Sequence, residues 1–264
     1  MPSVEENLKL WDDEANWRQN GDEWSIPFGN TQALWWFVIY PRIHRFIPAK
    51  RILEIAPGHG RWTQFLRQYC ESLVVVDLSP KCIEECKERF SSFSNITYYV
   101  NDGRSLDVVP DGAIDFAFSF DSLVHAEKDV MQEYVQQLAR KLAPHGIAFI
   151  HHSNIGHYST TLQLLNRVPE RFRLRKIAFR LAHFRVCGRA ASMTADAFGR
   201  MCQSAGVSCV SQELISWAHG TRMIDAMSIF TPAKSIWARP NRVLWNPDFH
   251  NRSDDVKALS SLYT

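Results

Sequence analysis

The chain has 264 residues, of which 45% are hydrophobic and 22% charged, and its formal net charge is +2. These values are typical of a globular protein and argue against wholesale binding of DNA or of an anionic membrane, so a charged partner must meet a local patch. The length favours one α/β domain with an insertion and terminal extensions.

The first segment, residues 1–32, is polar and contains Trp11, Trp17 and Trp24. Turn signals interrupt it, and we interpret it as a cap that precedes the main fold. It has no basic stretch followed by an apolar one, so no secretory signal is visible and we expect a cytoplasmic protein. The apolar stretch 33–47 is broken by Pro41 and is too short for a membrane span, so it predicts a buried helix.

From Arg51 onward, short apolar runs alternate with helical segments. The predicted strands are 51–55, 72–78, 96–100, 114–120 and 147–153, and the predicted helices are 62–69, 80–90 and 129–142. A further helix over 194–205 and two closing strands, 207–215 and 226–232, follow later in the chain. This alternation predicts an α/β fold with a doubly wound, mostly parallel, seven-stranded sheet formed by residues 33–153 and 191–236.

Residues 154–190 interrupt that alternation with a basic helical insertion. It contains eight arginine and lysine residues, and Glu170 is its only acid. Guanidinium groups match the geometry of phosphates and carboxylates. We interpret the insertion as a substrate lid in which Arg171, Arg175 and Arg180 bind an anionic acceptor, with a merely solvated helix face as the alternative. The tail, 237–264, is expected to be irregular.

The loop after the first predicted strand reads Glu54-Ile55-Ala56-Pro57-Gly58-His59-Gly60. Glycines allow a tight turn and a close approach to a ligand at the edge where doubly wound sheets bind cofactors. A structural turn, a dinucleotide site and an S-adenosylmethionine site are the alternatives. A dinucleotide fingerprint requires glycine or alanine at the position of Thr63. The Glu54 carboxylate attracts an ammonium and a sulfonium but repels a diphosphate, which favours the methyl donor.

Acidic residues follow the next two predicted strands. Asp77 ends the strand 72–78, where a carboxylate can accept two hydrogen bonds from ribose hydroxyls. Its alternative is a cap or turn acid. Asp102 lies in Asn101-Asp102-Gly103, which is also a common turn sequence.

The segment LEIAPGHGRWT resembles the first motif of class I S-adenosylmethionine-dependent methyltransferases, with Ala56 in the place of the usual first glycine. The likeness covers about residues 50–152 and implies a Rossmann-like fold, S-adenosylmethionine as cofactor and S-adenosylhomocysteine as product. It also implies that Asp77 binds the ribose and Asp102 the adenine amino group. The predicted cofactor-binding residues are Glu54, Ala56, Gly58, Gly60, Asp77, Leu78, Asp102, Gly103 and Phe120. APGHGRWT further resembles methyltransferases of bacterial glycan and natural-product pathways, which favours oxygen as the methylated atom.

Candidate catalytic residues follow the fourth and fifth predicted strands. Methyl transfer to a hydroxyl requires alignment and a base, and His125 is the leading base because imidazole titrates near neutral pH. Asp121 is expected to hold that histidine, contact the cofactor or bind the acceptor. His152 is the second candidate base, and neighbouring His151 points to the opposite face of its strand. A divalent metal on Asp121, His125 and His152 is an alternative that no ligand spacing specifies, so no metal site is assigned.

Three other functions compete with O-methylation of a small or glycan-type acceptor. An RNA or nucleotide-base methyltransferase would use the basic insertion to track phosphates. A non-catalytic partner subunit would bind the cofactor without transferring a methyl group. An NAD-linked oxidoreductase is disfavoured by Glu54 and Thr63. The six cysteines lack zinc-ligand spacing and are interpreted as free thiols.

Overall fold

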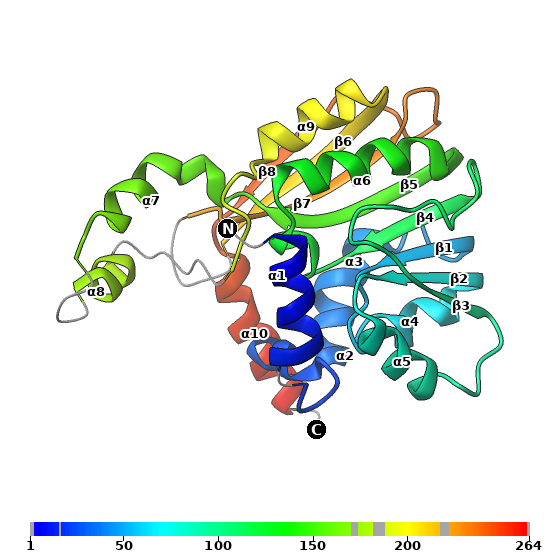
Figure 1. The fold of residues 1–264 in the computed structure, drawn as a ribbon, viewed down its shortest axis with the longest axis horizontal. Coiled ribbons are helices and arrows are strands. Elements are labelled where there is room, and N and C mark those ends of the chain that lie inside the picture. Colours follow the sequence, from blue (N-terminus) through cyan, green and yellow to red (C-terminus); the bar gives the residue numbers. More distant parts are fainter. Residues whose placement is uncertain (1–2, 16, 170–173, 182–187, 217–221, 263–264) are drawn as a thin grey trace.

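The computed structural model describes residues 3–15, 17–169, 174–181, 188–216 and 222–262. At its centre is one eight-stranded sheet with the order β3-β2-β1-β4-β5-β7-β6-β8 (Figure 1). The strands are β1 (Ala49–Ile55), β2 (Cys70–Asp77), β3 (Ile96–Val100), β4 (Ile114–Ser119), β5 (Leu142–Ser153), β6 (Val207–Ile215), β7 (Asp225–Pro232) and β8 (Arg242–Asn246). β7 is antiparallel to β5 and β6, and the other neighbouring strands are parallel.

The predicted α/β fold with a mostly parallel sheet is confirmed, and all seven predicted strands form. The prediction of an irregular tail is wrong, because β8 adds an eighth strand and α10 (Phe249–Leu262) follows it. β8 forms by parallel pairing with β6, and the Asn246 side-chain amide donates a hydrogen bond of 2.6 Å to Glu213. Such long-range pairing overrides weak local preferences, which is why the sequence pattern missed it.

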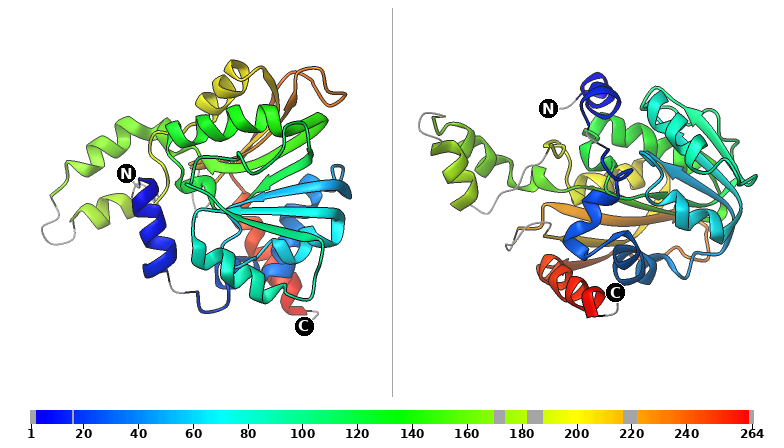
Figure 2. Two further views of the ribbon diagram at one scale, coloured as in Figure 1. Left: turned by 45° about the vertical axis from the view of Figure 1, so that its right-hand side comes forward. Right: turned by 90° about the horizontal axis from the view of Figure 1, so that it is seen from below.

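Helices cover both faces of the sheet (Figures 1 and 2). α6 (Lys128–Lys141) and α9 (Ala195–Ser204) pack on one face, around Ala148 and Ile150 of β5. The other face, which presents Phe149, is covered by α2 (Thr31–Leu34), α3 (Tyr40–Ile43), α4 (Thr63–Leu66), α5 (Pro80–Arg89) and α10. The alternation of side chains along β5 therefore divides its residues between two separate cores.

The predicted buried helix over 33–47 is helical from Thr31 to Ile43. Trp35 is fully buried there, and its ring stacks on Phe65 with centroids 4.7 Å apart. Trp35 thus belongs to the core on this face of the sheet, whereas its neighbours Trp36 and Phe37 are exposed. In the described part of the chain, no helix has both the length and the apolar character needed to cross a membrane.

Two segments lie outside the layered core. The N-terminal segment begins with α1 (Val4–Lys9), which a capping box between Ser3 and Glu6 starts, and reaches α2 through a helical turn at Asp22–Phe28. Within the insertion, α7 (Ser159–Asn166) and α8 (Leu174–Leu181) form an arm that projects from the body (Figures 1 and 2).

Candidate active site

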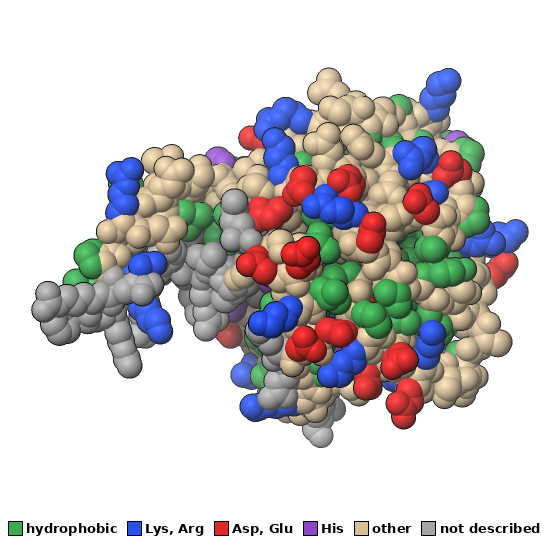
Figure 3. Space-filling model, viewed as in Figure 1, with side chains coloured by type: hydrophobic (Ala, Val, Ile, Leu, Met, Phe, Trp, Pro, Cys, Tyr) green, Lys and Arg blue, Asp and Glu red, His purple; other side chains and the backbone are tan. Residues whose placement is uncertain are grey.

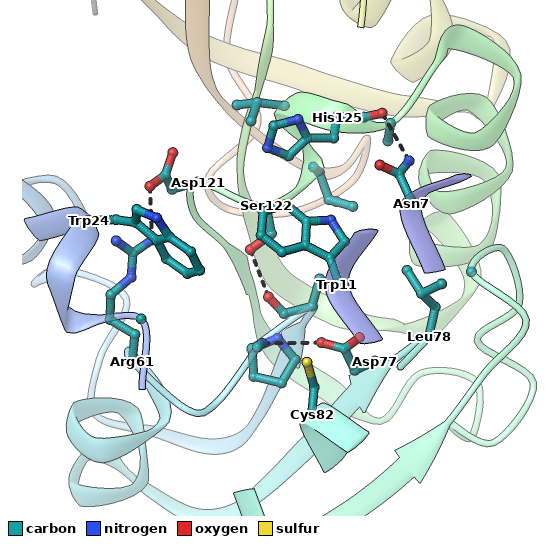
Figure 4. A pocket seen from close by; sticks show the side chains of 18 of the residues that line it. Asn7, Trp11, Trp24, Arg61, Asp77, Leu78, Cys82, Asp121, Ser122 and His125 are labelled. Atoms are coloured by element: carbon teal, nitrogen blue, oxygen red, sulfur yellow. Dashed lines mark hydrogen bonds and ion pairs between the residues drawn. The ribbon is translucent and has the colours of Figure 1, made fainter. Parts of the chain in front are cut away.

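A cavity of about 450 Å³ lies where the carboxyl ends of β1, β2 and β4 meet the N-terminal segment (Figure 4). The strand ends contribute the glycine loop, Asp77 and the residues after β4. The N-terminal segment contributes Trp11, Trp17 and Trp24, whose rings contact one another with centroids 4.8–5.8 Å apart. These tryptophans, which we call the tryptophan roof, enclose the edge of the sheet where a doubly wound fold binds its ligand.

The glycine loop combines left-handed backbone with close packing. Ala56, Gly58 and Gly60 have φ values of 56°, 60° and 83°. A Cβ atom on Gly60 would lie 2.4 Å from the Phe90 ring, and one on Gly58 would lie 2.6 Å from Trp17. Only glycine combines this backbone with such contacts, so packing against Trp17 and Phe90 requires glycine at these two positions.

Asp77 lies at the end of β2 and lines the cavity. One carboxylate oxygen accepts a hydrogen bond of 3.1 Å from the Gly58 amide, and the other accepts one of 2.9 Å from the Ser79 amide. Burial raises the pKa of Asp77 to about 6, against the opposing effect of these amides. The carboxylate is thus fixed in orientation, and its remaining lone pairs are available to hydroxyl donors.

Glu54 lies beneath the loop and does not line the cavity. The Thr63 hydroxyl donates a hydrogen bond of 2.6 Å to one carboxylate oxygen, and the other has no partner among the described residues. Burial raises the pKa of Glu54 to about 8. The direct attraction to a cationic ligand that the sequence suggests therefore stays a prediction.

The raised pKa of Glu54 predicts a pH-dependent free energy of unfolding. A carboxyl whose pKa is higher in the folded than in the unfolded protein contributes stability that is complete below pH 4.5 and is lost as the pH rises through 8. Relative to Glu54→Gln, the wild type should lose up to about 1.4 kcal/mol per pH unit across this window. Denaturant unfolding between pH 5 and 9 measures the difference. Glu84→Gln, an exposed position on α5, is the control, and parallel curves for wild type and Glu54→Gln would contradict the prediction.

The other predicted cofactor residues divide into two groups. Ala56, Gly58, Leu78 and Gly103 line the cavity with Asp77, whereas Gly60, Asp102 and Phe120, like Glu54, do not. The exposed Asp102 carboxylate accepts hydrogen bonds from the amides of Arg104 and Ser105 at 2.9 and 2.6 Å. This is the geometry of a turn acid, so its contact with adenine stays a prediction.

His125 lines the cavity beside Trp11, with ring centroids 5.4 Å apart (Figure 4). Its Nδ1 lies 2.9 Å from the carbonyl oxygen of Gly188, so Nδ1 carries the proton in this hydrogen bond. Burial lowers the pKa of His125, although the hydrogen bond to Gly188 opposes this. The imidazole is therefore neutral near pH 7, and Nε2 has a free lone pair.

Asp121 follows β4 in a left-handed conformation, with φ 63°. Its carboxylate pairs with the Arg61 guanidinium at 2.9 Å, and its backbone amide donates a hydrogen bond of 3.1 Å to Nδ1 of His151. One of the three roles expected for Asp121 was to hold His125, and the structure shows no hydrogen bond between these two side chains. The carboxylate instead orients an arginine at the cavity wall (Figure 4).

His152 lies on the other side of the sheet and does not line the cavity. Its ring stacks on Phe198 at 4.3 Å, and its Nε2 lies 2.8 Å from the hydroxyl of Ser228. The alternation along β5 places His151, not His152, beside Asp121. The described residues contain no cluster of three or more His, Cys, Asp or Glu side chains arranged for a metal ion.

Sequence reasoning missed two arginines of the cavity wall, Arg61 and Arg189. The Arg61 guanidinium lies between the rings of Trp24 and Trp62, at 5.6 and 4.6 Å from their centroids, and its Nη1 is buried without a partner among the described residues. Arg61 could have been predicted from its place in the motif APGHGRWT, directly after the glycine loop. The roof could have been predicted from three tryptophans in an otherwise polar segment.

Of the predicted acceptor-binding arginines, the structure describes only the side chain of Arg175. Arg175 on α8 donates a hydrogen bond of 3.2 Å to the Val168 carbonyl and does not line the cavity. Arg171 and the side chain of Arg180 lie outside the described residues. Acidic and basic side chains alternate over the body, whereas the arm shows only basic charged side chains in Figure 3. A role for the arm in acceptor binding therefore stays a prediction.

Comparisons with known proteins agree with this geometry. Residues 52–146 match the family model of the methyltransferase domain. The PH0226 protein from Pyrococcus horikoshii shares 18% identity over 85% of this chain and 95% of its own, with a TM-score of 0.56. The N-methyltransferase NodS from Bradyrhizobium japonicum, in complex with S-adenosyl-L-homocysteine, shares 16% identity over 87% of this chain and 98% of its own, with a TM-score of 0.54. At these identities the structural likeness shows the fold alone. No curated protein matches the chain in sequence.

Residues 52–146 therefore form a methyltransferase domain, in agreement with the resemblance of the first motif to class I S-adenosylmethionine-dependent methyltransferases. S-adenosylmethionine is the cofactor that this resemblance implies. The cavity fits this molecule, because a carboxylate at Asp77 suits ribose hydroxyls and the unpartnered Nη1 of Arg61 suits a carboxylate.

Proposed function

We propose that this methyltransferase methylates a hydroxyl oxygen of an anionic, glycan-type acceptor, with His125 as general base. The observation that carries this proposal is the hydrogen bond from His125 Nδ1 to the Gly188 carbonyl, which leaves a neutral imidazole with Nε2 unprotonated at the cavity. A base with this protonation state is required for an alcohol and superfluous for an acceptor that is already anionic at the reacting atom.

Bound S-adenosylmethionine supplies an activated methyl group. We assign its binding to Ala56, Gly58, Asp77, Leu78 and Gly103. Asp77 would accept hydrogen bonds from the ribose hydroxyls, and Arg61 Nη1 would donate one to the carboxylate. His125 Nε2 would take the proton of the acceptor hydroxyl as its oxygen receives the methyl group that the cofactor would supply. The tryptophan roof excludes water from the reacting atoms.

The basic side chains of the arm support an anionic acceptor. The two arginines that line the cavity are paired with carboxylates, Arg61 with Asp121 and Arg189 with Asp225, whereas the arm carries Arg167, Arg175 and Lys176 farther out. A compact acceptor would not reach the arm. An acceptor long enough to reach the arm would also meet its basic side chains, which favours a glycan chain and keeps 154–190 as the proposed substrate lid.

Incubating the protein with methyl-labelled S-adenosylmethionine and fractionated acceptor pools tests this function. We expect label in acidic glycans or nucleotide-linked sugars, as an ether that resists mild alkali. Alkali-labile label would indicate a carboxyl ester and contradict the proposed base. Label in RNA would support the alternative in which the arm tracks phosphates, and cofactor binding without any transfer would support a non-catalytic role.

A further inference from the structure

Residues 188–190, at the end of the insertion, contact the proposed catalytic histidine and the residue before it. Gly188 accepts the hydrogen bond from His125 Nδ1, and the Ala190 amide donates one of 2.9 Å to the Val124 carbonyl. A Cβ atom on Gly188 would lie 3.3 Å from His125 Nδ1, and φ at Gly188 is +70°. Glycine thus allows the backbone to approach the imidazole closely. The two hydrogen bonds hold the backbone on both sides of Arg189.

The Arg189 side chain binds the buried carboxylate of Asp225. Its Nε and Nη2 donate hydrogen bonds of 2.6 and 2.7 Å to the two oxygens of Asp225, the first residue of β7. Arg189 is 6% exposed and Asp225 is fully buried. Burial alone would raise the pKa of Asp225, but the Arg189 guanidinium holds it well below its ordinary value. The pair is therefore charged, bidentate and fixed to a central strand.

The same carboxylate reaches the other wall of the cavity through His151. His151 Nε2 lies 3.5 Å from an oxygen of Asp225, and His151 Nδ1 accepts the hydrogen bond from the Asp121 amide. Asp121 in turn orients Arg61. One buried carboxylate therefore connects to both His125 and Asp121, although neither lies next to it in sequence.

We infer that the buried pair Arg189–Asp225 is a positioning device that fixes the tautomer and orientation of His125 through the Gly188 carbonyl. This inference rests on the proposed function insofar as it makes His125 the base. A buried ion pair is seldom more stabilising than apolar residues of the same volume, because desolvation offsets the attraction. The pair is therefore better explained by orientation of His125 than by stabilisation of the fold. Residues that contact metal-bound histidines orient those histidines in the same way.

The test replaces the pair without leaving a lone buried charge. We expect Arg189→Met/Asp225→Leu to fold, since both charges are removed together. Nitrogen-15 NMR of the imidazole should show that His125 shifts from the Nδ1–H tautomer of the wild type towards a mixture with Nε2–H. We expect kcat to fall roughly 100-fold from misplacement of the base, with S-adenosylhomocysteine affinity within about twofold of wild type.

The matched control is another bidentate pair, Arg42–Glu213, whose two hydrogen bonds are both 2.7 Å and which does not line the cavity. Arg42→Met/Glu213→Leu should change neither the tautomer nor kcat. An unchanged His125 tautomer in the Arg189→Met/Asp225→Leu protein would overturn the inference and leave the proposed function intact. Full activity of a His125 variant would instead remove the base, while the tautomer measurement would still decide whether the pair positions the ring. If the double variant fails to fold, Arg189→Lys replaces it, because lysine keeps a positive charge beside Asp225 but loses the bidentate geometry; the same NMR measurement is interpreted in the same way.

Discussion

Replacing His125 with glutamine should lower kcat by roughly 10²- to 10⁴-fold, because the acceptor hydroxyl then loses its proton without a positioned base. Glutamine is a polar side chain of similar length and can still donate a hydrogen bond to the Gly188 carbonyl. The backbone of residues 188–190 should therefore keep its conformation. Initial rates with labelled methyl donor and saturating acceptor measure the loss.

The affinity for S-adenosylhomocysteine separates catalysis from cofactor binding in this experiment. It should stay within about twofold of wild type, since a base that acts only in the transition state adds little to ground-state binding. His44→Gln, at the exposed histidine that follows α3, is the control and should keep the full rate. A His125→Gln protein as fast as wild type would show that another group, or the solvent, takes the proton.

Replacing Asp77 with alanine should weaken S-adenosylhomocysteine binding by roughly 10- to 100-fold, which corresponds to about 1–3 kcal/mol. The variant loses the acceptor for the ribose hydroxyls and also frees the amides of Gly58 and Ser79, which the carboxylate now orders. Isothermal titration calorimetry measures the change directly.

Asp102→Ala serves as the comparison for Asp77, because Asp102 is exposed and lies off the cavity. Its geometry as a turn acid predicts a change of less than about threefold in affinity. A large loss for Asp102→Ala would establish the adenine contact that the family resemblance implies. An unchanged affinity for Asp77→Ala would remove Asp77 from the cofactor site.

Much of the fold could be predicted because local patterns and global topology agree. The apolar runs that become β1 to β7 are bounded by turn residues, and their alternation with helices leaves few arrangements other than a doubly wound sheet. β8 and α10 escaped prediction because their sequences carry no periodic pattern. They form through pairing with β6 and through packing of Phe249 and Val256 on the core.

The candidate site was harder to predict for a different physical reason. Motif residues of the loop and Asp77 reach the cavity because strand ends meet at one edge. The choice between His151 and His152 depends on which of the two side chains lies on the same face of the sheet as the end of β4, and the sequence of β5 alone does not reveal this. The contact between Arg189 and Asp225 joins residues 36 positions apart, and no local pattern reports it.

The tryptophan roof also has a mechanical consequence. Trp24 belongs to the helical turn that ends at Phe28, and the Phe28 ring packs edge-on against Phe249 of α10, with centroids 5.9 Å apart. The N-terminal segment is thus in contact with the C-terminal helix. Because Trp24 and Phe28 belong to one helical turn, a substitution at Phe249 should shift the roof and change the turnover rate, although α10 does not line the cavity.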